Sequence, residues 1–144
     1  MVTYNTQIEI PRSVKEVYAV ISDYKKAPQW ITGLKQIDIL SGTPGREGAK
    51  SKYTFEERGK EVIFYEKMVE VQPESYFIYR LQSDAVNMEA KTALEPRNGH
   101  TVVKMNNKVQ GNSFLMKLVL PFMKGMMKKR QLQDLQQLKA LLES

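Results

Sequence analysis

The sequence contains no cysteine. This absence excludes disulfides, thiolate metal ligands and cysteine nucleophiles, and it fits a reducing compartment. Histidine is almost as scarce, since His100 is the only one, and its segment PRNGHTV is typical of an exposed hairpin turn. No carboxylate cluster, Ser-His-Asp set, Walker loop or GxGxxG segment accompanies it. We therefore expect no metal site, no cofactor and no catalytic residue of these kinds.

Long apolar runs are also missing. No stretch reaches the roughly 18 apolar residues that a membrane-spanning helix needs. The opening segment MVTYNTQIEIP lacks the basic region and apolar stretch of a signal peptide. At 144 residues the chain is long enough to bury a core, so we expect one cytoplasmic domain over residues 1–144.

The positive charge is concentrated near the end of the chain. The net charge is +6, and residues 113–144 carry +4 of it. The basic residues there alternate with Leu and Met, whereas nucleic-acid binding usually pairs basic groups with exposed aromatic rings. The sequence therefore predicts no nucleic-acid partner, and it predicts no particular oligomeric state.

Hydrophobic periodicity divides the chain into strands, two short helices and one long helix. Ser13 with Glu16 three residues later indicates a helix start, and KKAPQWITG indicates a second short helix that ends at Gly33. The spacing then changes to two, with turn residues between the segments. Strands are expected at 2–10, 34–40, 50–57, 61–71, 75–83, 86–95 and 101–110.

The faces of three strands follow from alternation. Strands 86–95 and 101–110 place apolar residues on one face and charged residues on the other, and strand 75–83 follows the same pattern. Strand 61–71 has apolar and charged residues on both faces, so its orientation is not determined.

The last segment, 113–143, predicts a long helix. Leu132, Leu135, Leu138 and Leu142 form a stripe that faces a core. The first half is apolar nearly all round, and Pro121 is expected to bend it because proline removes a backbone donor.

The opening third of the chain resembles a known superfamily. IEIPRSVKEVYAVISDYKKAPQWITGLKQIDIL is similar to the start of SRPBCC proteins, which include START-related, Bet v 1-like and polyketide cyclase/dehydrase-like members. GREGAKSKYTF, VEVQPESYFIYRL and MKKRQLQDLQQLKALLES resemble later segments of the same pattern. The pattern positions are held by Pro11, Val14, Val17, Ile21, Asp23, Pro28 and Trp30.

This resemblance implies an α+β, helix-grip (Bet v 1-like) fold. A curved antiparallel seven-stranded sheet is expected around a long C-terminal helix, with two short helices between strands 1 and 2 and a cavity beneath the long helix. Members of the superfamily bind lipids, quinones, sterol-like or polyketide-like molecules. The inward positions expected to line the cavity are Trp30, Tyr53, Phe55, Phe77, Tyr79, Leu81, Met88, Ala90, Thr92, Val103, Met105, Asn107, Phe114, Leu118 and Phe122.

Several of these positions allow two interpretations. Thr92 and Asn107 could fix the polar end of a ligand or could be satisfied within a packed core. Trp30 is more often a core anchor than a ligand contact. Glu66 and Glu70 are expected on the wet face, but an inward carboxyl with a raised pKa would be a candidate acid or base.

Three other acidic residues are weaker candidates for a functional site. Glu56, Glu57 and Glu61 flank a turn in TFEERGKE and are expected to form a solvated hairpin tip.

Residues 113–130 are the most unusual segment, with many apolar residues, five basic residues and no acid. One interpretation is a buried helix whose lysines extend to water. The other is an amphipathic surface for an anionic membrane or a partner. The residues expected to form that surface are Lys124, Lys128, Lys129 and Arg130.

The sequence as a whole favours a protein that binds or carries an apolar small molecule and is not an enzyme. The alternatives are a cyclase, dehydratase or hydrolase acting on such a molecule, and a membrane- or partner-binding module that uses residues 113–130.

Overall fold

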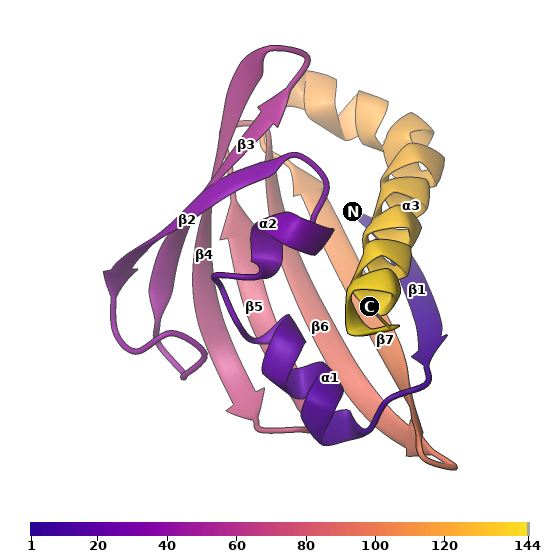
Figure 1. The fold of residues 1–144 in the computed structure, drawn as a ribbon. Helices are drawn as coiled ribbons and strands as arrows, with labels where there is room; N and C mark the ends of the chain where they lie inside the picture. The colour runs from indigo at the N-terminus through magenta and orange to yellow at the C-terminus, as the bar shows by residue number, and fades with distance from the viewer. Residues whose placement is uncertain (144) are drawn as a thin grey trace.

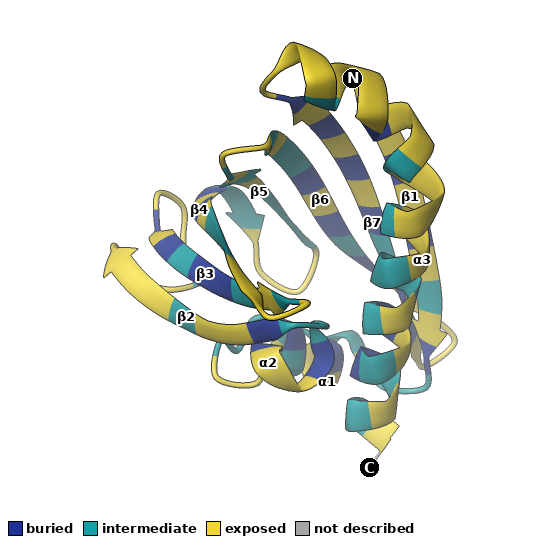
Figure 2. Cartoon of the chain, turned by 90° about the horizontal axis from the view of Figure 1, so that it is seen from above, coloured by how far each residue is buried: buried dark blue, intermediate teal, exposed yellow. Residues whose placement is uncertain are grey.

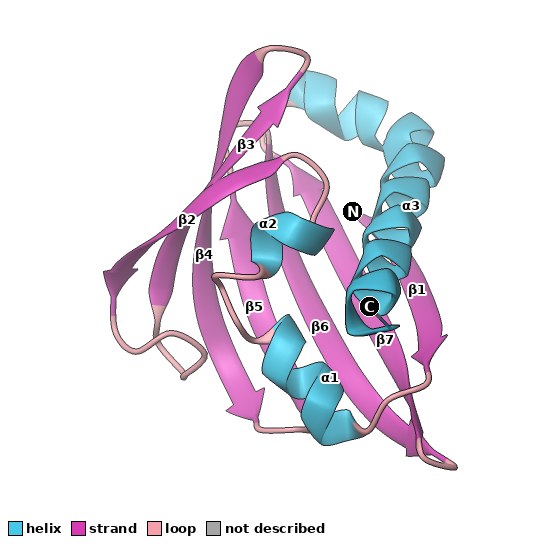
Figure 3. Cartoon of the chain, in the orientation of Figure 1, coloured by secondary structure: helices cyan, strands magenta, loops and turns pink. Residues whose placement is uncertain are grey.

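A computed structural model describes residues 1–143. Seven strands form one antiparallel sheet with the order β1-β7-β6-β5-β4-β3-β2 (Figures 1 and 3). The last six strands follow one another as a meander, as the sequence predicts, and the first strand pairs with the last. The strands are β1 (Val2–Ile10), β2 (Leu34–Ser41), β3 (Lys50–Glu57), β4 (Lys60–Gln72), β5 (Tyr76–Gln82), β6 (Val86–Arg97) and β7 (His100–Gly111).

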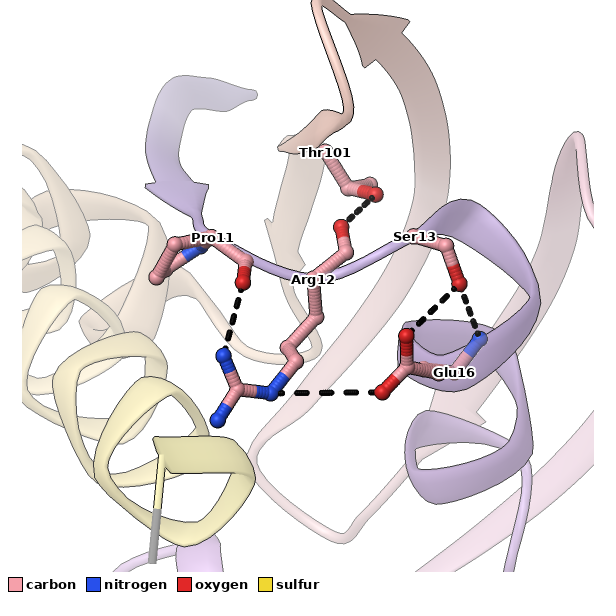
Figure 4. Close-up of polar contacts among 5 residues, drawn as sticks. All are labelled: Pro11, Arg12, Ser13, Glu16 and Thr101. Atoms are coloured by element: carbon pink, nitrogen blue, oxygen red, sulfur yellow. Dashed lines mark hydrogen bonds and ion pairs between the residues drawn. The ribbon is translucent and has the colours of Figure 1, made fainter.

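Two short helices, α1 (Val14–Ile21) and α2 (Ala27–Trp30), connect β1 to β2. The start of α1 is fixed as the sequence predicts: the Ser13 hydroxyl accepts a hydrogen bond from the Glu16 amide at 3.2 Å (Figure 4). The same hydroxyl donates to the Glu16 carboxylate. The preceding residue is tied to β7, because Thr101 donates to the Arg12 carbonyl at 2.8 Å. These contacts hold α1 at one end of the sheet.

Alternation on β6 and β7 gives the sheet one dry face. Ala90, Thr92 and Leu94 are buried, whereas Asn87, Lys91 and Glu95 are exposed. The undetermined orientation of β4 has a simple cause, because its pairing with β5 shifts between Met68 and Glu70. This bulge changes which residues face inward, so no single alternation fits the whole strand.

The long helix α3 (Phe114–Glu143) lies on the concave side of the sheet and packs mainly on β1, with further contacts to α2 and β7 (Figures 1 and 2). Leu135 and Leu138 of the predicted stripe are fully buried, and Leu132 and Leu142 are partly buried. Leu135, Leu138 and Leu142 pack into a core that includes Ile10 and Val103. The second half of α3 is therefore the anchored half.

The first half of α3 is different. Its opening turns run in another direction from the rest of the helix in Figure 1, and Pro121 lies within the helix as the sequence predicts. Figure 2 shows these turns largely in the colour of exposed residues. Within residues 1–143, no helix combines the length and hydropathy required to cross a bilayer.

Candidate functional site

A cavity of about 300 Å³ lies between the sheet, the α1–α2 segment and α3. Its walls are mostly apolar and aromatic, which is the usual character of a small-molecule site. Nine of the fifteen residues expected to line it do so, from α2 and strands β3, β5, β6 and β7. These are Trp30, Tyr53, Phe55, Phe77, Tyr79, Leu81, Met88, Thr92 and Met105.

Trp30 is both a core residue and a lining residue of the cavity. Its ring is 5% exposed and packs in the same core as Leu135 and Leu138, yet it also borders the cavity. Its indole Nε1 is buried without a hydrogen-bond partner within residues 1–143.

Three expected lining residues are instead buried in the core. Ala90 and Val103 do not border the cavity. Asn107 donates to the Tyr4 carbonyl at 3.2 Å and exchanges hydrogen bonds with the amide of Gln131 on α3 at 2.8 and 3.2 Å. Asn107 is thus a satisfied core residue that holds α3 to the sheet.

The expectation that Phe114, Leu118 and Phe122 line the cavity is wrong. Their side chains are 78%, 54% and 89% exposed, and none borders the cavity. The physical reason is the bend in α3, since its opening turns leave the direction of the anchored half (Figure 1).

Glu66 on β4 faces the cavity, so the expectation that it lies on the solvent-exposed face of the sheet is wrong. It is 6% exposed. One carboxylate oxygen accepts a hydrogen bond from the Tyr24 hydroxyl at 2.8 Å, and the other accepts one from Tyr53 at 2.9 Å. Glu70, beyond the bulge, accepts a hydrogen bond from Tyr76 and does not line the cavity.

Burial governs the protonation of Glu66, Tyr24 and Tyr53. Burial raises the pKa of Glu66 above its ordinary value, although the two tyrosine hydrogen bonds act in the opposite direction. Burial and then the Glu66 charge raise the pKa values of Tyr24 and Tyr53, so both hydroxyls remain protonated near neutral pH. The arrangement is a carboxyl with two phenol donors inside an apolar cavity.

A second polar group lies where the cavity meets solvent. Arg130 of α3 forms an ion pair with Glu57 and donates to the Thr32 carbonyl at 2.8 Å. Four residues further along α3, the Asp134 carboxylate accepts hydrogen bonds from the Thr32 amide at 2.9 Å and hydroxyl at 2.6 Å. These contacts connect α3 to the α2–β2 loop and to the β3–β4 hairpin.

This geometry corrects two further expectations. Glu57 does not belong to a freely solvated hairpin tip, because it is paired with Arg130 and lines the cavity. Arg130 does not belong to the exposed basic surface, because it is half-buried at the cavity. Glu56 is paired with Lys35 at 2.9 Å.

Charged side chains at the cavity are few and mainly acidic. Glu57, Glu66 and Asp134 line it, and Arg130 is the one basic residue among the described residues that does. No group of three or more His, Cys, Asp or Glu side chains within residues 1–143 is placed to hold a metal ion. His100 is exposed and lies 3.8 Å from Glu9.

Sequence reasoning missed Tyr24, Gln131 and Asp134. Gln131 and Asp134 could have been found, because they lie seven and four residues before Leu138 and so share the core-facing side of α3. Tyr24 lies in an irregular turn between α1 and α2, where no periodicity indicates an inward position.

The exposed part of α3 forms a surface of its own, which we call the apolar front. Six large apolar side chains, at spacings of four residues in two rows, are between 37% and 89% exposed. Lys117, Lys124, Lys128 and Lys129 are exposed on the same turns. The apolar front consists of Phe114, Leu115, Leu118, Val119, Phe122 and Met126.

The element order, the curved sheet and the long helix over a cavity define the helix-grip, Bet v 1-like fold. A family model described as polyketide cyclase / dehydrase and lipid transport matches residues 1–143. The chain belongs to this family, and the resemblance to the SRPBCC superfamily is confirmed. A comparison with curated proteins found no match.

Solved structures agree on the fold at low sequence identity. The Zhui aromatase/cyclase from Streptomyces sp. R1128 has a TM-score of 0.83 at 11% identity, over 99% of this chain and 93% of that one. A START superfamily protein from Mycobacterium smegmatis has a TM-score of 0.81 at 17% identity, over 98% and 97%. A protein from Thermus thermophilus has a TM-score of 0.81 at 15% identity, over 98% and 97%. At such identities the likeness extends to the fold alone.

Proposed function

We propose that this protein binds and carries an apolar small molecule in the cavity between the sheet and α3. The observation that carries the proposal is the cavity itself, about 300 Å³ in volume and lined by aromatic and aliphatic side chains such as Phe77, Tyr79 and Met105. A carrier needs only a matching apolar shape and one or two polar anchors. Glu66 with its tyrosines is available as such an anchor.

A titration with N-phenyl-1-naphthylamine, a neutral apolar fluorophore, tests this proposal. We expect saturable binding of one probe per chain, with a blue-shifted emission because the probe leaves water. Binding that does not saturate, or an emission unchanged from that in buffer, contradicts the proposal.

We further propose that the carrier exchanges its ligand at an anionic membrane surface through the apolar front. The apolar front is exposed over several turns, and four exposed lysines accompany it. Residues 113–130 contain no acid that would oppose contact with negative lipid headgroups. Apolar residues beside lysines suit the boundary between headgroups and acyl chains, and this charge complementarity favours an anionic bilayer.

An enzymatic function is the second candidate, and Glu66 is the observation that favours it. A buried carboxyl with a raised pKa and two phenol donors at a cavity wall is a chemically plausible acid or base. The carrier is preferred because it needs only the apolar cavity and a polar anchor, whereas catalysis also needs a reactive group of the ligand held at Glu66. If a reaction on a bound ligand is found, Glu66→Gln must abolish it at unchanged ligand affinity for this second candidate to replace the carrier.

A further inference from the structure

The charge of the cavity is opposite to the charge of the molecule. The chain has 22 Lys and Arg against 16 Asp and Glu, yet three carboxyls and a single arginine of the described residues line the cavity. The charge of this arginine is already paired, because Arg130 forms an ion pair with Glu57 and donates a hydrogen bond to the Thr32 carbonyl. A ligand in the cavity therefore meets a net excess of acidic groups.

Glu66 is the most deeply placed of these acids. No Lys or Arg of residues 1–143 forms an ion pair with it, and its partners are the two hydroxyls of Tyr24 and Tyr53. A carboxylate has about four lone-pair sites, so two hydrogen bonds leave acceptor capacity unused. A buried carboxylate without a cation is costly, and a cation that arrived with the ligand would relieve that cost.

The surroundings of Glu66 also suit a cation. The ring of Tyr53 lies 6.2 Å from that of Tyr24 and 6.4 Å from that of Phe55, and Phe55 lies 5.6 Å from Phe64. All four rings line the cavity. Aromatic faces attract ammonium groups, and they attract them more strongly away from water.

From these observations we infer that the cavity takes a lipophilic amine: an apolar body that bears a protonated amino group, with the ammonium placed at Glu66. The inference rests on the proposed function, because it specifies the ligand of the same cavity. A lipid carboxylate would bring its charge toward Glu66 and Asp134. A neutral alcohol would keep the apolar contacts and would gain no charge pairing.

Three matched ligands test the inference: decylamine, 1-decanol and decanoate, each used to displace N-phenyl-1-naphthylamine near pH 7.5. We expect decylamine to bind at least about tenfold more tightly than either of the others, a difference of roughly 1.4 kcal/mol. The net charge of +6 would by itself favour decanoate, so it cannot produce this order.

Two variants then assign the preference to one side chain. Glu66→Gln should bind decylamine about tenfold more weakly, and its affinity for 1-decanol should change by much less. Glu70→Gln is the matched control, because Glu70 lies on the same strand, is also bonded to a tyrosine and lies outside the cavity. Glu70→Gln should bind the three ligands in the same order of affinity as the wild type. If Glu66→Gln fails to fold, the comparison of the three ligands on the wild-type protein still tests the inference.

Two results overturn the inference and leave the proposed function intact: 1-decanol or decanoate binding the wild type as tightly as decylamine, or Glu66→Gln retaining the preference for the amine. If the fluorophore and all three ligands fail to bind, the proposed function itself is wrong.

Discussion

The hydroxyl of Tyr53 donates a hydrogen bond of 2.9 Å to the carboxyl of Glu66 across neighbouring strands, inside the cavity. Tyr24 donates to the other oxygen of the same carboxyl. These contacts leave Glu66 buried without an opposite charge, which makes its protonation sensitive to folding.

Stability should therefore depend on pH through Glu66. Its pKa is raised in the native protein above an ordinary value of 4.5, so the folded state binds the proton more tightly than the unfolded state does. The free energy of unfolding of the wild type should fall, relative to Glu66→Gln, as the pH rises from about 4.5 through the native pKa. The slope cannot exceed about 1.4 kcal/mol per pH unit.

Urea denaturation of both proteins between about pH 4 and pH 8 measures this difference. Asp134, whose pKa burial also raises, is present in both proteins, so its contribution cancels. A difference that stays constant with pH, or one that changes in favour of the wild type as pH rises, contradicts the account.

The succession of strands and helices along the chain could be predicted from the sequence, because each element shows its own periodicity. Residues 86–95 of β6 alternate between apolar and polar side chains, and Leu135 and Leu138 indicate the buried side of α3. Local residue spacing is sufficient for such features.

The inward orientation of Glu66 could not be predicted, because the register shift between Met68 and Glu70 places inward residues on both parities of β4, so local alternation does not identify the inward face. The exposure of Phe122 could not be predicted either. An apolar helix segment has the same sequence whether it covers a cavity or faces water, and the bend in α3 decides between the two.

The ion pair between Arg130 and Glu57 should act on ligand exchange more than on stability. The two side chains are 38% and 42% exposed, so the pair contributes no more than about 1 kcal/mol to folding. It nevertheless connects α3 to the β3–β4 hairpin at the edge of the cavity. Arg130→Gln should release N-phenyl-1-naphthylamine several-fold faster in stopped-flow measurements, at a nearly unchanged thermal midpoint.

Lys35→Gln is the matched control for that change. Lys35 is paired with Glu56, the residue next to Glu57, and neither Lys35 nor Glu56 lines the cavity. Equal dissociation rates in wild type, Arg130→Gln and Lys35→Gln would refute a role for the Arg130 pair in exchange.

The apolar front should bind anionic vesicles in a salt-dependent manner. Each lysine near an anionic bilayer surface contributes about 1 kcal/mol, so Lys117, Lys124, Lys128 and Lys129 together contribute roughly 4 kcal/mol, about a thousandfold in affinity. Changing these four to Gln should abolish co-sedimentation with phosphatidylserine-containing vesicles at low salt. Neutral vesicles should bind neither protein.

A second variant separates local charge from net charge. Lys50, Lys67, Lys91 and Lys108 are exposed on the sheet, and changing them to Gln removes the same total charge. This variant should still bind. Wild-type protein that does not sediment with anionic vesicles at low salt would refute membrane contact, and dimerisation lost on Phe122→Gln would assign the apolar front to a second copy instead.

The central claim is that the ligand lies between the sheet and α3, and blocking that space tests it most directly. Leu81 and Met88 are paired across β5 and β6 and both line the cavity, whereas the next pair, Gln82 and Asn87, is exposed on the same strands. Changing Leu81 and Met88 to Trp should reduce the affinity for N-phenyl-1-naphthylamine by at least about tenfold, roughly 1.4 kcal/mol, and changing Gln82 and Asn87 to Trp should leave it unchanged. Folding of both is checked by circular dichroism. Equal probe affinity in the two folded double variants would contradict the account.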